Sequence, residues 1–221
     1  MRPPKHGVEF VQGSVTDPAA ITRALWDMDT FIWLVMQSPQ GGSEVDQDPE
    51  IIANNYEVNC KGLHTFLWVA QGLDVRQGIY TSTMSVHYRN RDYYHNEDAL
   101  MLDTPSAYGV SKGFGEGICR YFARWFDMNI MALRITGPRT REQWIEERKA
   151  ALEPGRGQGY FATDEEDLAN AFLAAVDFVQ KGHGNFEAVF IAGDEKEVEV
   201  NLTKAKSLLG WQPTSHLKVE V

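Results

Sequence analysis

Short apolar runs bounded by turn-forming residues alternate along the chain with longer segments whose apolar residues recur at helical spacing. This order predicts a parallel sheet covered by helices, which is an α/β fold. The expected strands are Val8–Val11, Thr30–Val35, Gly78–Thr83, Asn129–Arg134 and Phe186–Ala192. The expected helices are Asp17–Asp27, Pro49–Gln71, Ser106–Phe126, Asp164–Gln180 and Lys204–Leu209, the last ending at Gly210.

The chain of 221 residues is long enough for one main domain with a small appendage. Its formal charge of −10 repels nucleic acid and anionic membranes, so we expect neither as a partner and favour a small-molecule substrate. Cys60 and Cys119 lie far apart and outside any metal-binding spacing, which favours free thiols in a reducing compartment. The longest apolar run, Phe31–Met36, is too short to cross a bilayer. These features predict a cytoplasmic protein.

Tyr108 and Lys112 lie on one expected helix, in the segment SAYGVSKGFGEG. Side chains at this spacing share a helix face, and a nearby ammonium favours the phenolate, so we expect Lys112 to lower the pKa of Tyr108. The pair could then act as a general acid and base. Upstream, the expected strand GIYTST ends in Thr83, where open α/β sheets bind their ligands. The spacing alone is common by chance, and its alternative is a surface tyrosine beside a solvated lysine.

Ordered segments along nearly the whole chain resemble the NAD-dependent epimerase/dehydratase family of the extended short-chain dehydrogenases/reductases. GVEFVQGSVTDPAAITRAL is similar to the family's third strand and the turn after it, and TFIWLVMQSP to its fourth strand. NNYEVNCKGLHTFLWVA resembles the helix that carries Asn-Val-x-Gly-Thr, with Asn59 and Gly62 matching. IYTSTMSVHY resembles the Ser/Thr strand, SAYGVSKGFGEGICRYFARWFDMNIMALRITGP the Tyr/Lys helix with the next strand, and KAKSLLGWQP the family's common ending.

This resemblance implies a hydride-transfer site. Tyr108 would exchange a proton with a substrate hydroxyl or carbonyl while NAD or NADP takes or gives the hydride. Thr83 would orient the substrate oxygen, Lys112 would bind the nicotinamide ribose, and Asn59 would support the site from a neighbouring helix. The implied catalytic residues are Tyr108, Lys112 and Thr83; the implied substrate-binding residues are Thr83, Met84, Ser85 and Tyr108; the implied cofactor-binding residues are Lys112, Tyr108, Asn59, Ser14, Val15 and Val35.

The sequence departs from the family at the cofactor loop. The family begins with a strand, a Gly-x-x-Gly-x-x-Gly turn and a helix whose amides hold the pyrophosphate, and the chain contains none of these. We therefore expect an N-terminally truncated member whose Rossmann-like doubly wound parallel sheet lacks its first two strands. NAD or NADP binding should be weakened or lost. Val8–Val11 then either pairs with Thr30–Val35 or leaves a central sheet edge open.

Two of the implied cofactor positions also depart from the family. Ser14 stands where the family has an aspartate that contacts adenine, and Val35 and Met36 stand where small residues leave room for the cofactor ribose. The alternative for Val35 and Met36 is ordinary core packing, which we favour.

The stretch after the Tyr/Lys helix and its strand is short. We expect 1–139 to form the truncated dinucleotide-binding domain with the Tyr/Lys site, and 140–221 to form a small C-terminal substrate cap, from which Asp164–Ala192 returns to the main sheet. A compact sugar or sugar acid suits such a cap at least as well as a whole nucleotide sugar. Met84 and Ser85 follow Thr83 where dehydratase members carry acidic residues, which disfavours dehydration.

The segment VHYRNRDYYHNED holds His87, Asp92 and His95 without regular ligand geometry, so we expect a solvated loop and no metal site. The resemblance implies that this loop borders the substrate, where Tyr88, Tyr93 or Glu97 could touch it.

On the Tyr/Lys helix, Phe114, Ile118, Phe122 and Trp125 form an apolar stripe that is typical of a core-facing surface. The resemblance implies that part of this stripe belongs to a homodimer interface built on the Tyr/Lys helix.

The sequence therefore predicts an NAD(P)-dependent oxidoreductase or epimerase that acts on a sugar, sugar acid or nucleotide sugar through Tyr108, Lys112 and Thr83. The alternative is a non-catalytic remnant or fragment that keeps the site architecture and cannot hold the dinucleotide. The intact trio favours the first interpretation, and the missing glycine-rich turn favours the second.

Overall fold

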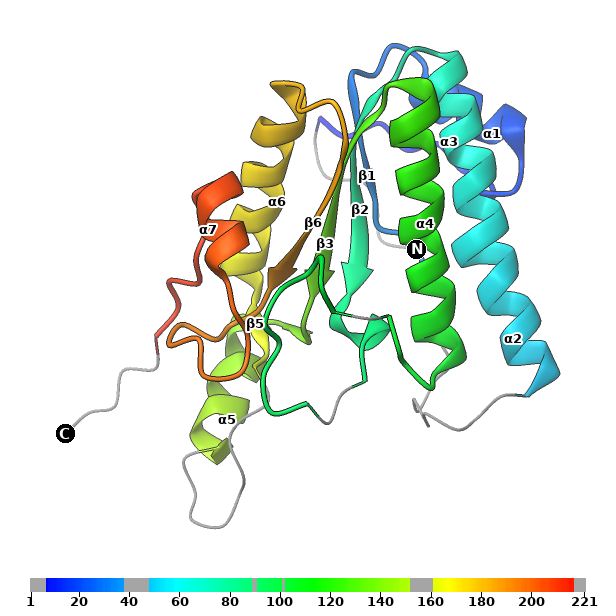
Figure 1. The fold of residues 1–221 in the computed structure, drawn as a ribbon. Coiled ribbons are helices and arrows are strands. Elements are labelled where there is room, and N and C mark those ends of the chain that lie inside the picture. Colours follow the sequence, from blue (N-terminus) through cyan, green and yellow to red (C-terminus); the bar gives the residue numbers. More distant parts are fainter. Residues whose placement is uncertain (1–6, 38–47, 89–90, 101, 152–160, 217–221) are drawn as a thin grey trace.

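The computed structural model describes residues 7–37, 48–88, 91–100, 102–151 and 161–216, and its centre is a four-stranded parallel sheet (Figure 1). The strands are arranged in the order β1-β2-β3-β6. They are β1 (Thr30–Trp33), β2 (Gln77–Thr83), β3 (Asn129–Ile135) and β6 (Phe186–Ile191). All three pairings are parallel, so the carboxyl ends of the strands meet at one edge. The expected Rossmann-like α/β fold is confirmed.

The helices begin where the sequence places capping residues. The Asp17 and Asp48 side chains accept hydrogen bonds from the N–H groups of Ala19 (3.0 Å) and Glu50 (2.8 Å). A π-helical segment, Tyr56–Gly62, interrupts the helix expected from Pro49 to Gln71. No helix in the described ranges combines the length and apolarity needed to cross a membrane. The helices are α1 (Pro18–Leu25), α2 (Pro49–Asn55), α3 (Leu63–Gly72), α4 (Ala107–Phe126), α5 (Arg141–Ala151), α6 (Glu165–Gln180) and α7 (Thr203–Leu209).

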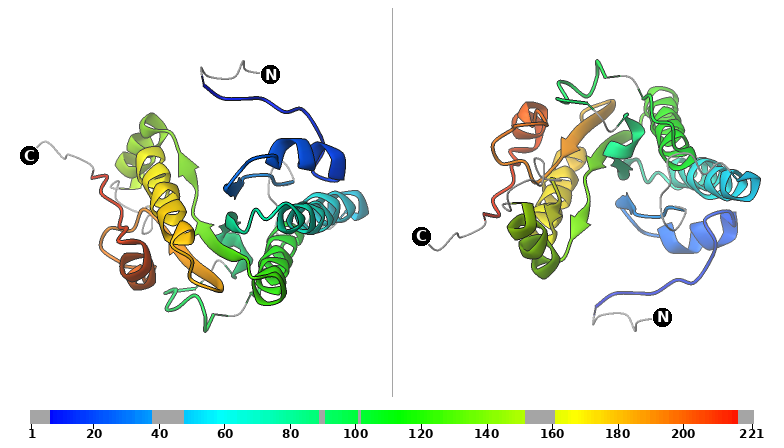
Figure 2. Two further views of the ribbon diagram at one scale, coloured as in Figure 1. Left: turned by 90° about the horizontal axis from the view of Figure 1, so that it is seen from above. Right: turned by 90° about the horizontal axis from the view of Figure 1, so that it is seen from below.

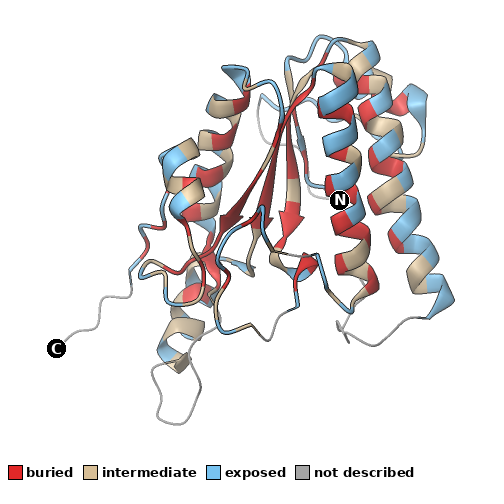
Figure 3. Cartoon of the chain, in the orientation of Figure 1, coloured by how far each residue is buried: buried red, intermediate tan, exposed pale blue. Residues whose placement is uncertain are grey.

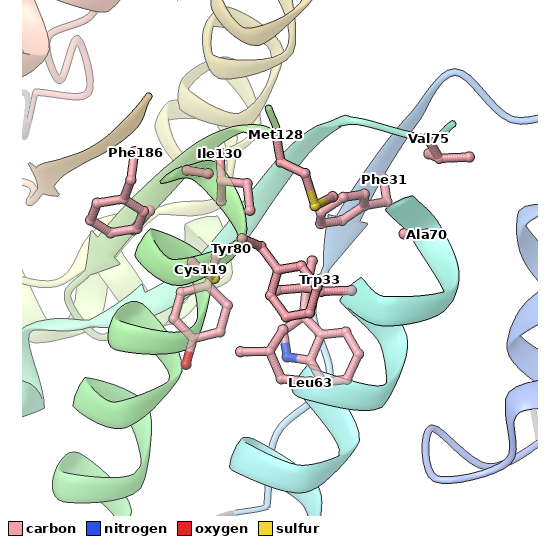
Figure 4. Packing of buried hydrophobic residues seen from close by; sticks show 14 of the residues in the cluster. Phe31, Trp33, Leu63, Ala70, Val75, Tyr80, Cys119, Met128, Ile130 and Phe186 are labelled. Atoms are coloured by element: carbon pink, nitrogen blue, oxygen red, sulfur yellow. The ribbon is translucent and has the colours of Figure 1, made fainter. Parts of the chain in front are cut away.

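The sheet is sandwiched between two helical layers (Figures 1 and 2). Because strand side chains alternate between faces, Ile130 and Ala132 of β3 join the core under α3 and α4, whereas Met131 and Leu133 join the core under α6. Figure 4 shows the first of these cores, in which Tyr80 of β2 packs among residues from the sheet, α3 and α4. The strands β2, β3 and β6 are largely buried, whereas Ile32 of β1 is exposed, and so are the outer helix faces (Figure 3).

The expected strand Val8–Val11 does not form. These residues have no strand conformation, and the Val8 and Phe10 side chains are 60% and 55% exposed. A lone extended segment has no neighbour to accept its backbone hydrogen bonds, and β1 pairs only with β2 among the described strands. Of the two arrangements expected for this region, the structure therefore has the open edge along β1.

A small substructure lies below the carboxyl edge of the sheet (Figure 1). It consists of α5 and a two-stranded parallel ladder of β4 (Pro138–Arg139) and β5 (Thr163–Asp164). Residues 152–160 of the stretch expected to leave the sheet are outside the described ranges. After this excursion α6 packs on the sheet and β6 pairs with β3.

Helix α4 approaches β2 closely at Gly115. A Cβ atom added there would lie 2.1 Å from the Tyr80 hydroxyl oxygen and 3.2 Å from Leu63 Cδ2. The neighbouring Gly117 faces solvent, and nothing lies within 4 Å of a Cβ added to it. Of these two glycines, packing therefore requires Gly115 and not Gly117.

We expect Gly115→Ala to lower the free energy of unfolding by about 1–3 kcal/mol, because the added methyl group displaces the Tyr80 ring. Gly117→Ala is the matched control on the same helix and should raise it by roughly 0.5–1 kcal/mol, since alanine is the better helix former. Urea denaturation of both variants measures these effects. Equal effects of the two substitutions would contradict the packing argument.

Candidate active site

Thr83 and Tyr108 meet at the carboxyl edge of the sheet, where β2 ends and α4 begins. Ser106 caps α4 by accepting the N–H of Gly109 at 3.4 Å. A Cβ atom on Gly109 would lie 2.1 Å from the Ser85 carbonyl oxygen, so glycine allows the first turn of α4 to touch the segment after β2. This contact brings the Tyr108 phenol beside Thr83.

The Tyr108 hydroxyl is partly shielded from water by its neighbours. Its oxygen lies 3.4 Å from Met36 Sδ, just beyond β1. Burial raises the pKa of Tyr108, and a hydrogen bond with the Thr83 side chain opposes this in part, so the pKa lies above its usual value. The expected lowering of this pKa by Lys112 is therefore wrong for this arrangement.

Lys112 is buried, with only 2% of its surface exposed. Its Nζ lies 4.2 Å from the centroid of the Tyr80 ring, and the Tyr80 hydroxyl donates to the Lys112 carbonyl at 3.1 Å. Burial lowers the pKa of Lys112 to about 8, although Cys119 and Glu116 act in the opposite direction. The alternative of a solvated lysine is thus wrong, and Tyr80 is a site residue that the sequence did not indicate.

Asn59 connects the segment after β1 to helix α4. Its side-chain amide donates to the Gln37 carbonyl (2.9 Å) and to Ser111 Oγ (2.9 Å), while its oxygen accepts the Gln37 N–H (2.8 Å). Ser111 Oγ in turn donates to the Tyr108 carbonyl at 2.8 Å. Asn59 lies in the π-helical segment, a conformation frequent at functional sites.

The remaining expected cofactor residues are less closely connected to Tyr108. Val35 and Met36 are both exposed, so the core packing favoured for them is wrong, and Met36 contacts the phenol. Val15 packs against Gly62, where an added Cβ would lie 2.8 Å from Val15 Cγ2. The Ser14 hydroxyl bonds to Thr16 Oγ1 at 2.8 Å within its own turn.

These residues fit the nicotinamide-ribose end of a dinucleotide. Lys112 offers a buried ammonium over the Tyr80 ring, one helical turn along α4 from Tyr108, whose side chain forms a hydrogen bond with that of Thr83. The described ranges hold no Gly-x-x-Gly-x-x-Gly turn for the pyrophosphate. The described part of the site therefore corresponds to the nicotinamide-ribose end of the dinucleotide and not to its pyrophosphate.

A pocket of about 340 Å³ opens beside Thr83. Its walls include Met84 and Ser85, which the sequence indicated, together with residues from four other segments of the chain. The lining residues are Thr83, Met84, Ser85, Tyr94, Ile135, Thr136, Gly137, Phe161, Glu199 and Val200.

The loop after β2 is not uniformly solvated as expected. Glu97 is 4% exposed, and its carboxylate accepts the Phe190 N–H at 2.8 Å, which ties the loop to β6. His87 is also buried, with Nε2 3.2 Å from Arg134 Nη1. Within the described ranges, no three side chains of the metal-ligating types form a cluster.

A buried ion pair between Glu116 and Arg134 lies beneath the site. Arg134 binds both carboxylate oxygens, through Nε at 2.9 Å and Nη2 at 2.7 Å, and the Ser82 hydroxyl donates to the same carboxylate at 2.6 Å. Glu116 follows Lys112 by one helical turn, and Ser82 precedes Thr83. The pair therefore fixes β2, β3 and α4 next to the reactive residues, and its one sequence signal is a charged residue on the apolar face of α4.

Comparison with known proteins is consistent with this geometry. The model of the NAD-dependent epimerase/dehydratase family matches residues 2–149. An L-arabinose 1-dehydrogenase (NAD(P)(+)) of Haloferax volcanii is 28% identical over 234 residues, covering 95% of this chain and 83% of the relative. A short-chain dehydrogenase/reductase superfamily protein of Agrobacterium tumefaciens with bound NAD superposes with a TM-score of 0.76 at 17% identity, over 98% of this chain and 84% of that one. UDP-glucose 4-epimerase of Brucella ovis, in complex with NAD, superposes with a TM-score of 0.72 at 17% identity, over 93% and 80%.

We expect Glu116→Gln to lower the free energy of unfolding by about 3–5 kcal/mol, because it leaves the Arg134 charge buried without its partner. Glu57→Gln is the control, since it breaks the exposed Glu57–Lys61 pair and should cost at most about 0.5 kcal/mol. Urea denaturation distinguishes the two. A loss for Glu116→Gln as small as that of the control would contradict the assigned role.

Lys112 generates a prediction about pH. Its pKa is about 8 in the folded chain and 10.5 in the unfolded chain, so between these values the unfolded chain binds more protons and stability rises with pH. Below pH 8 the full cost of burying the charge is present. Lys112→Met should therefore be more stable than the unaltered protein at pH 7, by roughly 1–3 kcal/mol, and this difference should shrink towards pH 10. Urea denaturation at both pH values tests the sign, and a variant less stable at pH 7 would contradict it.

Proposed function

Because the chain belongs to the NAD-dependent epimerase/dehydratase family, we propose that it is an NAD(P)-dependent oxidoreductase or epimerase acting on a sugar, sugar acid or nucleotide sugar. The observation that carries this proposal is the meeting of Thr83 and Tyr108 above a pocket, with Lys112 one helical turn further along α4. The sugar dehydrogenase and the nucleotide-sugar epimerase among its relatives support the substrate class.

In the proposed reaction the substrate oxygen binds between the hydroxyls of Thr83 and Tyr108. When bound, NAD(P) supplies the hydride acceptor or donor at the carbon that carries this oxygen. During oxidation Tyr108, as phenolate, takes the hydroxyl proton, and during reduction its neutral phenol returns a proton to the carbonyl oxygen. The Lys112 ammonium binds the nicotinamide ribose. Since the pKa of Tyr108 is raised, its neutral, proton-donating form predominates at neutral pH.

The size of the pocket supports a compact substrate. About 340 Å³ is near the lower end of the range for small-molecule sites, which suits a single sugar ring. Two lining segments, around Phe161 and Glu199, come from the C-terminal part of the chain. In this proposal 140–221 contributes part of the substrate pocket, whereas 1–139 carries the reactive residues and the rest of the pocket wall.

The exposed aromatic side chains on α3 and α4 support a homodimer. The expected stripe divides: Phe122 is fully buried, whereas Phe114 and Trp125 are 55% and 65% exposed. Trp68 on the adjacent α3 is exposed as well. Apolar residues on two neighbouring helices form a surface suited to a two-fold interface.

Tyr108→Phe removes the exchangeable proton, so we expect kcat for NAD(P)-linked sugar oxidation to fall by roughly 10²–10⁴-fold with stability little changed. Tyr121→Phe is the control, because Tyr121 lies on the exposed side of the same helix. The assay follows the absorbance of NAD(P)H. Retained activity in Tyr108→Phe would assign the proton transfer to another group, and no turnover by the unaltered protein with either cofactor would favour the non-catalytic alternative.

A further inference from the structure

Glu199 lines the wall of the pocket that contains Thr83. Among the described residues that line this pocket, it is the only one with a carboxylate or a cationic side chain. The others offer hydroxyl groups, backbone groups and apolar surface. The charge of the pocket is thus set by a residue outside every motif considered above.

The backbone of Glu199 is fixed from both sides. The Asp194 carboxylate, which is 2% exposed, accepts the N–H groups of Val198 (3.1 Å), Glu199 (2.8 Å) and Val200 (3.0 Å). The Glu199 carbonyl accepts the Tyr94 N–H at 2.7 Å. Because the buried Asp194 side chain and a second chain segment both hold this loop, the backbone of Glu199 is rigidly supported.

Three arginines of β4 and α5 are paired with carboxylates. Arg139 is paired with Glu147 at 2.5 Å, and Arg141 with Asp164 at 2.5 Å. Arg148 is paired with Glu195 at 3.3 Å. None of these three arginines lines the pocket. An anionic substrate group would therefore meet the Glu199 carboxylate without a matching cation from the described pocket walls.

We infer that Glu199 is a specificity-determining residue that directs the pocket towards neutral polyhydroxylated substrates and against those that carry a carboxylate or phosphate at this position. The inference rests on the proposed function and narrows its substrate class. A carboxylate accepts hydrogen bonds from two sugar hydroxyls, whereas it repels a second anion in a partly desolvated site. Burial and the neighbouring Asp194 already raise the pKa of Glu199, so a further negative charge would add to an existing electrostatic cost.

The test compares the binding of D-galactose and D-galacturonate, which differ only in a hydroxymethyl or carboxylate group at one carbon. Ligand-detected NMR titrations at pH 7, with and without excess NAD⁺, give both dissociation constants. We expect the unaltered protein to bind galactose at least about tenfold more tightly, and Glu199→Gln to reduce this preference to about threefold or less by weakening galactose binding and removing repulsion of galacturonate.

The matched control is Glu146→Gln on the exposed side of α5, which removes the same charge away from the pocket and should leave the preference unchanged. Thermal unfolding of each variant checks that it is folded. Equal binding of the two sugars by the unaltered protein, an unchanged preference in Glu199→Gln, or no binding of either sugar would overturn the inference. Galactose binding without NAD(P)-linked oxidation would instead contradict the proposed oxidoreductase activity and leave the role of Glu199 standing.

Discussion

The buried ion pair between Glu116 and Arg134 connects the three elements on which the site is built. Two charges removed from water are stable only when their geometry satisfies them, and here two guanidinium hydrogen bonds and the Ser82 hydroxyl do so. Because Ser82 adjoins Thr83 and Glu116 follows Lys112 by one turn, the same contacts hold the reactive side chains at a fixed separation. The register between β2 and α4 is thereby specified by a polar interaction inside an apolar core.

Unlike the charges of the Glu116–Arg134 pair, the buried charge of Lys112 lowers the stability of the fold. Its ammonium lies over the Tyr80 ring, in a position that lowers its pKa to about 8 and that costs stability while the group is charged. A core optimised for stability alone would place an apolar side chain there. A destabilising buried charge beside a phenol is common at reactive sites, since the groups that act on a substrate must keep unsatisfied interactions for it.

In the proposed reaction the pocket would add a selectivity that Thr83, Tyr108 and Lys112 do not contain, because these three residues would serve any substrate with an oxygen on the reacting carbon. Which substrate enters would then depend on the loops beyond the carboxyl ends of β3 and β6, and on the charge that they present. The Asp194 carboxylate organises one of these loops and thereby places Glu199 at the pocket wall.

Local patterns in the sequence predicted the strands β1, β2, β3 and β6 and every α-helix of the described ranges except α5, because apolar periodicity and capping residues act over a few residues. The same locality identified Thr83, Tyr108 and Lys112. The prediction of a strand at Val8–Val11 was wrong, because a strand needs a neighbouring strand to pair with and apolar composition alone does not supply one. Only the tertiary structure decided the pairing of Glu116 with Arg134, the burial of Lys112 and the placement of Glu199. Each depends on contacts between segments distant in the chain, whose energies arise when folding excludes water from between them.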